Sequence, residues 1–375
     1  MAGIYIHIPF CKKACHYCNF HFSTSLGLKN DFLNALLKEM ELQKSYLADE
    51  TVKSIYLGGG TPSLLESNEC FAILEQLKNT YDISGDAEIT LEANPDDLND
   101  IKLRHWKESG INRLSIGVQS FFEEDLTWMN RAHTATQSHH NLAMAKKYFD
   151  NITIDLIYGT PTLTDKKWEE NINRAIQLEI PHLSCYALTV EPKTVLHTLI
   201  EKNKIANIDA GDQARQFLIL MELMVGNGYE HYEISNFALP GKRSRHNSSY
   251  WQGASYLGLG PSAHSFNKKS RQWNVSNNAL YIQSLQKNQL PFELEILTTI
   301  QQMNEYVMTS LRTREGIDLM YVFNQFGDKE RLRLEHSAKT FIDRELVCQK
   351  ENNLVLTTNG KLFADGIAAD LFGEY

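Results

Sequence analysis

Short β-rich hydrophobic runs alternate with longer amphipathic stretches over the first two hundred or so residues of the chain. The runs predict six strands, at Ile4–Ile8, Ser54–Leu57, Glu88–Leu91, Arg113–Val118, Ile152–Ile157 and Leu183–Leu188. Helical spacing of apolar residues predicts helices between the strands, at Phe32–Met40, Ser67–Asn79, Asn99–Ser109, Gln137–Phe149 and Asp165–Leu178. This order of strands and helices indicates an α/β fold with a parallel sheet and crossover helices.

Two architectures fit such a pattern, an open doubly wound sheet and a (β/α) barrel. Polar or glycine-rich residues follow nearly every predicted strand, at Cys11–Cys18, Gly58–Pro62, Glu92–Pro95, Gln119–Ser120, Gly159–Pro161 and Thr189–Pro192. A barrel gathers the carboxyl ends of many strands around one site. The pattern therefore favours a partial (β/α)6 barrel.

The alternation ends near residue 205, which divides the chain into a core barrel (1–205), a barrel extension (206–295) and a C-terminal domain (296–375). The extension contains a helix at Asp209–Gly226 and an unusual loop at Gly241–Trp251. In the C-terminal domain, helices are followed by a strand-turn-strand ribbon at Leu346–Leu356, which suggests a winged-helix-like module. Winged helices often bind DNA, but the mixed charges of Asp328–Glu335 favour docking or a lid.

Composition narrows the possible functions. The 375 residues include 37 Lys and Arg against 46 Asp and Glu, a formal charge of −9 that disfavours a general nucleic-acid binder. The N-terminus lacks the pattern of an export signal, and no run is apolar enough to span a membrane, so we expect a cytoplasmic protein. Six cysteines are too few for a disulfide scaffold.

Three of the cysteines are crowded into a loop after the first strand: Cys11, Cys15 and Cys18. Three thiolates in one loop can hold three irons of a cubane cluster and leave the fourth iron open to a ligand such as S-adenosylmethionine (SAM). The alternatives are a structural zinc site, completed by His7, His16 or His21, and a redox dithiol. A dithiol needs no third cysteine.

Seven motifs together resemble one family along nearly the whole chain: YIHIPFCKKACHYC, YLGGGTP, LEANPDDL, SIGVQSF, DLIYGTP, YALTVEP and YLGLGPSAHSF. They are similar to radical SAM proteins of the oxygen-independent coproporphyrinogen III oxidase family. The resemblance implies that Cys11, Cys15 and Cys18 bind a [4Fe-4S] cluster. The residues that match SAM contacts in the family are Tyr5, Tyr17, Gly59, Gly60, Thr61, Glu92, Gln119, Arg131, Asp155 and Ala187.

The chain departs from the family pattern at one position. The motif of the family's coproporphyrinogen dehydrogenases is CxxxCxxCxC, whereas this chain has Phe20 in place of the fourth cysteine. In this respect it resembles the HemW branch, whose members are regarded as haem chaperones without oxidase activity. The departure leaves the cluster motif intact and argues against decarboxylation.

The segment His246–Trp251 resembles the HNxxYW motif of that branch, and His246, Asn247, Tyr250 and Trp251 are the candidate haem residues. A histidine can ligate haem iron, aromatic rings can stack on a porphyrin, and neighbouring basic residues can pair with propionates. The same histidine can also be an ordinary core residue. His264 is a weaker candidate ligand.

The resemblance therefore predicts a haem chaperone that uses a [4Fe-4S] cluster and SAM and carries haem as cargo. Its expected partners are haem or another porphyrin, acceptor proteins that include membrane-associated respiratory proteins, and an electron donor, but not nucleic acid. Two alternatives remain, an oxygen-independent coproporphyrinogen III dehydrogenase and a radical SAM methyltransferase on the same scaffold.

Overall fold

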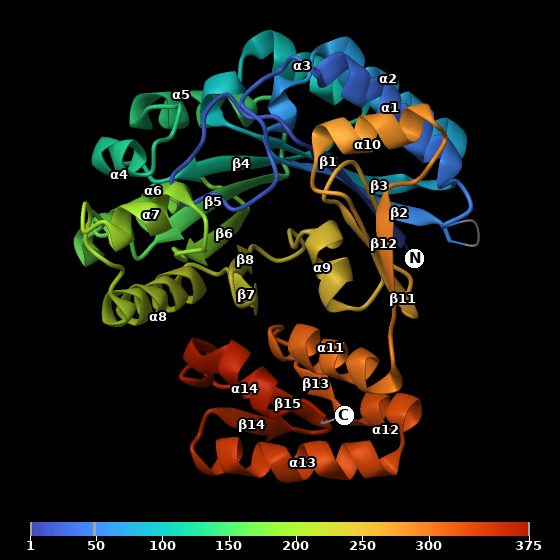
Figure 1. Ribbon diagram of the computed structural model, residues 1–375. Helices are drawn as coiled ribbons and strands as arrows, with labels where there is room; N and C mark the ends of the chain where they lie inside the picture. The colour runs from blue at the N-terminus through green and yellow to red at the C-terminus, as the bar shows by residue number, and fades with distance from the viewer. Residues whose placement is uncertain (1, 48–49, 374–375) are drawn as a thin grey trace.

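The computed structural model describes residues 2–47 and 50–373 (Figure 1). Its main sheet has twelve strands in the order β12-β11-β10-β9-β1-β2-β3-β4-β5-β6-β8-β7. All six predicted strands are confirmed as neighbouring parallel strands. They are β1 (Ala2–Ile8), β2 (Val52–Gly59), β3 (Ile83–Ala93), β4 (Arg113–Gln119), β5 (Ile152–Tyr158) and β6 (His182–Ala187).

The parallel strands curve into a barrel that does not close on itself. At one edge of the parallel strands, β1 pairs with β9 (Ser255–Leu259). At the other edge, β6 pairs with β8 (Asn236–Ala238), so β1 and β6 are not neighbours. The expected partial barrel is confirmed. Its opening leaves the interior wall of the sheet accessible to other parts of the chain.

Helices cover the outer face of the barrel, as Figure 1 shows. They are α1 (Lys29–Leu42), α2 (Ser67–Thr80), α3 (Asp100–Ser109), α5 (Ala135–Ala145), α6 (Asp165–Gln177) and α8 (Ala210–Gly226). The short helices α4 (Glu123–Trp128) and α7 (Val195–Glu201) pack beside the cysteine loop. The predicted helices are confirmed, although the one expected to reach Phe149 ends at Ala145. Single 3-10 turns, η1 (Pro62–Leu64) and η2 (Pro95–Asp97), follow β2 and β3.

The segment after residue 205 continues the same sheet instead of leaving it. The further strands are β7 (Glu230–Glu233), β10 (His264–Phe266), β11 (Ser270–Asn274) and β12 (Phe292–Ile296), and α10 (Asn278–Gln286) lies beside α1. The prediction of a loop up to Trp251 was wrong, because Arg245–Trp251 forms helix α9. The Ser244 hydroxyl caps this helix by accepting the Asn247 N–H. A seven-residue polar run is too short for periodicity to reveal.

The C-terminal segment has its own hydrophobic core, which includes Met303, Val307, Leu334 and Leu354. The expected helices and ribbon are present. The elements are α11 (Thr299–Leu311), β13 (Ile317–Asp318), α12 (Leu319–Phe326), α13 (Asp328–Asp343), β14 (Val347–Lys350), β15 (Asn353–Leu356), η3 (Gly360–Phe363) and α14 (Ala364–Asp370). Helix α11 contacts α9, so this segment faces the open side of the barrel (Figure 1). Within the described residues, no helix is both long and apolar enough to cross a membrane.

Candidate functional site

The cysteine loop is hydrogen-bonded to the end of α4 and to the segment that follows it. The His16 N–H donates to the Met129 carbonyl at 3.2 Å, and His16 Nδ1 lies 2.8 Å from the Trp128 carbonyl oxygen. The Asn130 side chain donates to the Ala14 carbonyl at 2.7 Å. These contacts join residues more than a hundred positions apart and hold the loop over the carboxyl ends of the strands.

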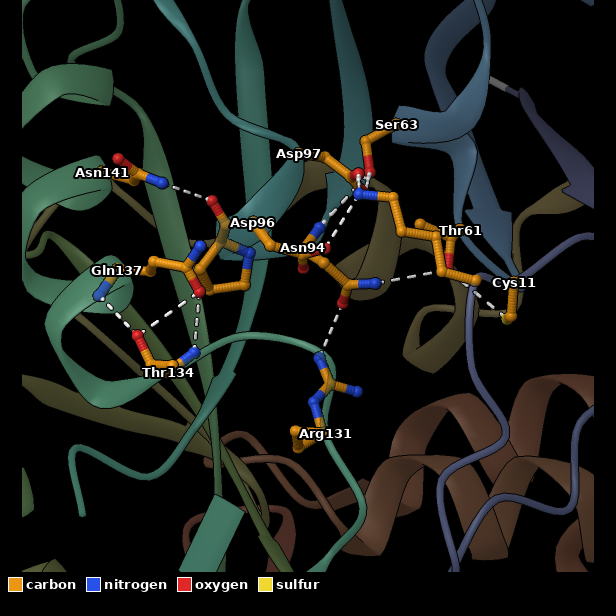
Figure 2. A network of polar contacts seen from close by, with 12 residues as sticks. Cys11, Thr61, Ser63, Asn94, Asp96, Asp97, Arg131, Thr134, Gln137 and Asn141 are labelled. Atoms are coloured by element: carbon orange, nitrogen blue, oxygen red, sulfur yellow. Dashed lines mark hydrogen bonds and ion pairs between the residues drawn. The ribbon is translucent and has the colours of Figure 1, made fainter. Parts of the chain in front are cut away.

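Two of the three sulfurs accept hydrogen bonds from the barrel. Thr61 Oγ1 donates to Cys11 Sγ at 3.4 Å, and Arg131 Nη1 donates to Cys15 Sγ at 3.3 Å. Asn94 connects the two donors, because its amide donates to Thr61 Oγ1 at 3.3 Å and its carbonyl oxygen accepts from Arg131 at 2.6 Å (Figure 2). Donors aimed at cysteine sulfurs stabilise negative charge on them and tune an iron–sulfur cluster.

The donor set fits a cubane cluster. In the described part of the chain, no three His, Cys, Asp or Glu side chains lie close enough together to bind one metal ion. A cubane cluster does not require this, because each cysteine binds a different iron atom. The rings of His7 and His16 are hydrogen-bonded to other protein groups. Burial raises the pKa of Cys11 to about 11, so ligation must displace a proton from this thiol.

Gly59, the last residue of β2, and Gly60, which follows it, are required by the packing of the protein itself. Gly59 has a φ of +105°, and a Cβ there would lie 2.6 Å from His7 Nδ1. A Cβ on Gly60 would lie 2.6 Å from the Phe10 carbonyl oxygen and 2.8 Å from that of Ile8. The expectation of a tight turn with positive φ is confirmed at Gly59. The backbone can therefore approach both the cysteine loop and a ligand closely.

We expect Gly60→Ala to disrupt the entry to the cysteine loop, because the added methyl group would collide with the rigid backbone at Phe10. The variant should lose most of its bound iron and at least about 1 kcal/mol of unfolding free energy. The matched control is Gly226→Ala in helix α8, where no heavy atom lies within 4 Å of the added Cβ. It should keep its iron and gain stability in denaturant titration. Wild-type iron content in Gly60→Ala would refute this reading of the turn.

The interior wall of the barrel places a carboxyl group beside this turn. Glu92 accepts hydrogen bonds from the Tyr56 hydroxyl at 2.8 Å and from the Gly59 N–H at 3.1 Å. Tyr5 stacks on Tyr56 with 6.2 Å between ring centroids. Burial is the main cause that raises the pKa of Glu92 to about 7; the nearby Asp155 acts in the same direction, and the hydrogen bonds from Tyr56 and Gly59 oppose it. Burial likewise raises the pKa of Asp155 to about 6.

The raised pKa of Glu92 predicts how stability depends on pH. Its folded-state pKa of about 7 lies above the ordinary value of 4.5, so the folded state binds the proton more tightly than the unfolded state. Glu92 therefore makes the protein less stable as the pH rises from about 4.5 to about 7. Glu92→Gln should flatten this decline by up to about 3 kcal/mol in denaturant titrations across that range. An unchanged pH profile would refute the assignment.

The remaining predicted SAM residues lie at the same end of the barrel. Gln119 is the last residue of β4 and has a φ of +64°, a strained conformation for a residue with a side chain. Ala187 is the last residue of β6. The Tyr17 hydroxyl accepts from Arg131 Nη1 at 3.3 Å. The structure thus brings together the predicted cluster and SAM residues, which come from separate strands and loops.

The candidate haem ligand His246 lies elsewhere, against the amino-terminal half of β2. It is 1% exposed, its Nδ1 lies 2.8 Å from Ser54 Oγ and its Nε2 lies 2.8 Å from the Tyr250 hydroxyl. Its backbone N–H donates to Glu88, and its ring stacks on Tyr56 at 5.1 Å. Both ring nitrogens are therefore occupied. Haem ligation by His246 stays a prediction that would require one of these hydrogen bonds to break.

Other residues of helix α9 face a cleft of about 1540 Å³ between the barrel and the C-terminal segment. Tyr250 and Trp251 line it, and the buried Trp251 indole nitrogen has no hydrogen-bond partner. Asn247 is half-buried on the same helix and is not among the lining residues. Of the basic residues just before α9, Arg243 lines the cleft, where it pairs with Glu230 and with a second glutamate.

Sequence reasoning missed a buried polar network at the floor of the barrel. Arg113 and Glu88 are 1% and 4% exposed, with 3.9 Å between guanidinium and carboxylate. Arg113 also donates to Thr153, whose hydroxyl lies 3.0 Å from His182 Nδ1. The available signal was the presence of Arg113 and His182 at the start of otherwise apolar runs. Through Glu88, this network holds the start of α9.

Comparison with known proteins identifies the family. The model of the radical SAM superfamily matches residues 5–175, and that of the HemN C-terminal domain matches residues 297–363. A "Heme chaperone HemW" from Bacillus subtilis is 34% identical over the full length of both chains. The chain belongs to the HemW family of radical SAM proteins. A HemW-family protein from Escherichia coli is 34% identical over 70% of this chain and 69% of its own.

The chain shares its fold with an enzyme of known structure. The solved structure of coproporphyrinogen III oxidase (HemN) from Escherichia coli matches with a TM-score of 0.86 over 99% of this chain and 90% of that protein. Sequence identity is 23%, so the match establishes the fold alone. Membership of the radical SAM superfamily implies a [4Fe-4S] cluster and SAM as cofactors.

Proposed function

We propose that this HemW-family protein is a haem chaperone, which binds haem and transfers it to acceptor proteins. The observation that carries the proposal is the cleft between the barrel and the C-terminal segment, together with full-length relatives named heme chaperones. The cleft has a volume of about 1540 Å³, which exceeds the ordinary range for small-molecule pockets, about 300 to 1,000 Å³. This volume accommodates a large macrocycle.

The chemistry of the cleft suits haem. Trp251 and Phe266 provide aromatic surface for a flat apolar ring. Arg243 and Arg271 can bind carboxylates by exchanging the glutamate partners that they now hold. Phe20, which is 67% exposed, lines the cleft at the end of the cysteine loop. This exposed aromatic residue extends the apolar surface of the cleft. It stands at the position where the motif of the family's dehydrogenases has a fourth cysteine. These features support cargo binding.

We assign the cofactors to the end of the barrel beside the cleft. Cys11, Cys15 and Cys18 would hold the cluster, and Thr61 and Arg131 would donate to its sulfur ligands. When bound, such a cluster supplies an electron and leaves one iron open to SAM. The Glu92 carboxyl group and the backbone after β2 would form the polar wall for SAM.

Anaerobic titration separates the chaperone from the two enzyme candidates. The cluster-reconstituted protein is titrated with haem and followed by its Soret absorbance, then incubated with SAM, a reductant and coproporphyrinogen III. We expect stoichiometric haem binding without conversion of coproporphyrinogen. Conversion to protoporphyrinogen IX would overturn the proposal in favour of the dehydrogenase, and methylated porphyrin would favour a methyltransferase.

The proposal extends to the partners. The acceptors would be haem-dependent proteins, including membrane-associated respiratory proteins, and a separate donor would supply electrons to the cluster. The thiol-rich cysteine loop suits a reducing compartment, so we place the loading of haem in the cytoplasm.

A further inference from the structure

Three histidines line the cleft: His7, His21 and His264. Both ring nitrogens of His7 are occupied, by the Tyr5 hydroxyl and the His21 carbonyl oxygen. Nε2 of His21 lies 2.7 Å from the Asn278 side-chain oxygen. Neither ring nitrogen of His264 has a hydrogen-bond partner among the described residues, and its side chain is exposed. Among the cleft histidines of the described residues, His264 is therefore the one with both ring nitrogens free of hydrogen bonds, so either can ligate a metal without first losing such a bond.

The backbone that carries His264 is held in one conformation. Gly260 and Ser262 adopt φ angles of +98° and +65°, and a Cβ on Gly260 would lie 2.5 Å from the His7 carbonyl oxygen. The buried Glu39 carboxyl group accepts from the Gly260 N–H at 2.8 Å and from the Asn274 amide at 2.6 Å. The Asn274 amide also donates to the Gly260 carbonyl at 2.9 Å. Such a turn fixes the position of a ligand before the cargo arrives.

The surroundings of His264 match an iron porphyrin. Its ring stacks against Trp273 with 6.2 Å between centroids, which limits rotation of the imidazole. Although His264 is exposed, partial desolvation in the cleft and the nearby positive charge of Arg271 lower its pKa, which favours the neutral imidazole that iron requires. Lys268 lines the same cleft and supplies a cation for a propionate, and Arg271 would have to exchange its ion pair with Glu305 for one with a propionate. Trp251 and Phe266 supply apolar surface.

On the basis of the proposed function, we propose that His264 is the axial ligand of the haem iron in the cleft. His246 then has a positioning role: its hydrogen bonds to Ser54 and Tyr250, and that of its backbone to Glu88, fix helix α9 so that Trp251 faces the cargo. Loss of either histidine weakens haem binding, but only the loss of His264 changes the ligand on the iron.

The test is an anaerobic haem titration of the full-length, cluster-reconstituted protein, read by Soret absorbance and by the EPR signal of ferric haem. We expect His264→Ala to bind haem at least about tenfold more weakly, with loss of the histidine-ligated spectrum. Added imidazole should restore that spectrum in His264→Ala. His336→Ala, an exposed histidine on α13, is the matched control and should behave as wild type.

The outcomes separate this inference from the proposed function. If the wild-type protein binds no haem, the chaperone proposal fails. If the wild type binds haem and His264→Ala keeps its affinity and spectrum, the ligand assignment alone is overturned. His246→Gln should keep the histidine-ligated spectrum in whatever fraction binds haem. Loss of that spectrum in a variant with native circular dichroism would assign the iron to His246 instead.

Discussion

Cys15→Ala is expected to lose nearly all cluster iron, from about four irons per chain to almost none. Cys15 accepts a hydrogen bond from the half-buried Arg131, which also donates to Asn94 and Tyr17. Without this sulfur the cluster has two protein ligands, and the guanidinium faces an empty space. Iron and sulfide analysis after anaerobic reconstitution, together with visible absorbance, measures the loss.

Cys348→Ser is the matched control for the cysteine loop. Cys348 is a partly exposed cysteine on β14, remote in sequence from the loop, and its variant should take up as much iron as wild type. Equal iron contents in Cys15→Ala and wild type would remove Cys15 from the ligand set. A parallel loss in both variants would indicate that unfolding, not ligand removal, caused the result.

Arg113→Leu should destabilise the protein by about 3–5 kcal/mol, because it leaves the buried Glu88 carboxylate without its partner. The double variant Arg113→Leu/Glu88→Gln should recover part of this loss, since glutamine keeps an acceptor for the His246 N–H without the charge. Chemical denaturation of the wild type, both single variants and the double variant gives the coupling free energy.

An exposed ion pair provides the control for this cycle. Arg104 pairs with Asp100 on the surface of α3, and Arg104→Leu should cost less than about 1 kcal/mol. A similarly small effect of Arg113→Leu would show that the buried pair contributes little to stability. Additive effects of Arg113→Leu and Glu88→Gln would show that the two side chains are not coupled.

The parallel strands and the cysteine loop could be predicted because their signals are local. The strands are apolar runs bounded by turns, and polar residues such as Glu92 and Gln119 directly follow or end them. Once the strands are parallel, their carboxyl ends meet, so the SAM residues assemble without knowledge of any contact. The pattern of cysteines likewise lies within a single loop.

Long-range contacts set the limit of prediction. Helix α9 is too short to show periodicity, and its position depends on Ser54 and Glu88, which lie more than 150 residues before His246. Sequence reasoning identified His246 as a haem candidate but could not show that both ring nitrogens are occupied. An extension of the barrel over 206–295 was expected, but its strands β7 to β12 were not predicted, because they are short and join the sheet through the long-range pairs β1–β9 and β6–β8.

The most direct test of the chaperone account is the rate at which bound haem moves to an acceptor. Haem-loaded protein is mixed anaerobically with an excess of an apo-haem protein, and the acceptor's Soret band is followed at several acceptor concentrations. The account predicts a rate that rises with acceptor concentration, because transfer occurs within an encounter complex. A rate that equals spontaneous haem dissociation at every acceptor concentration would contradict it.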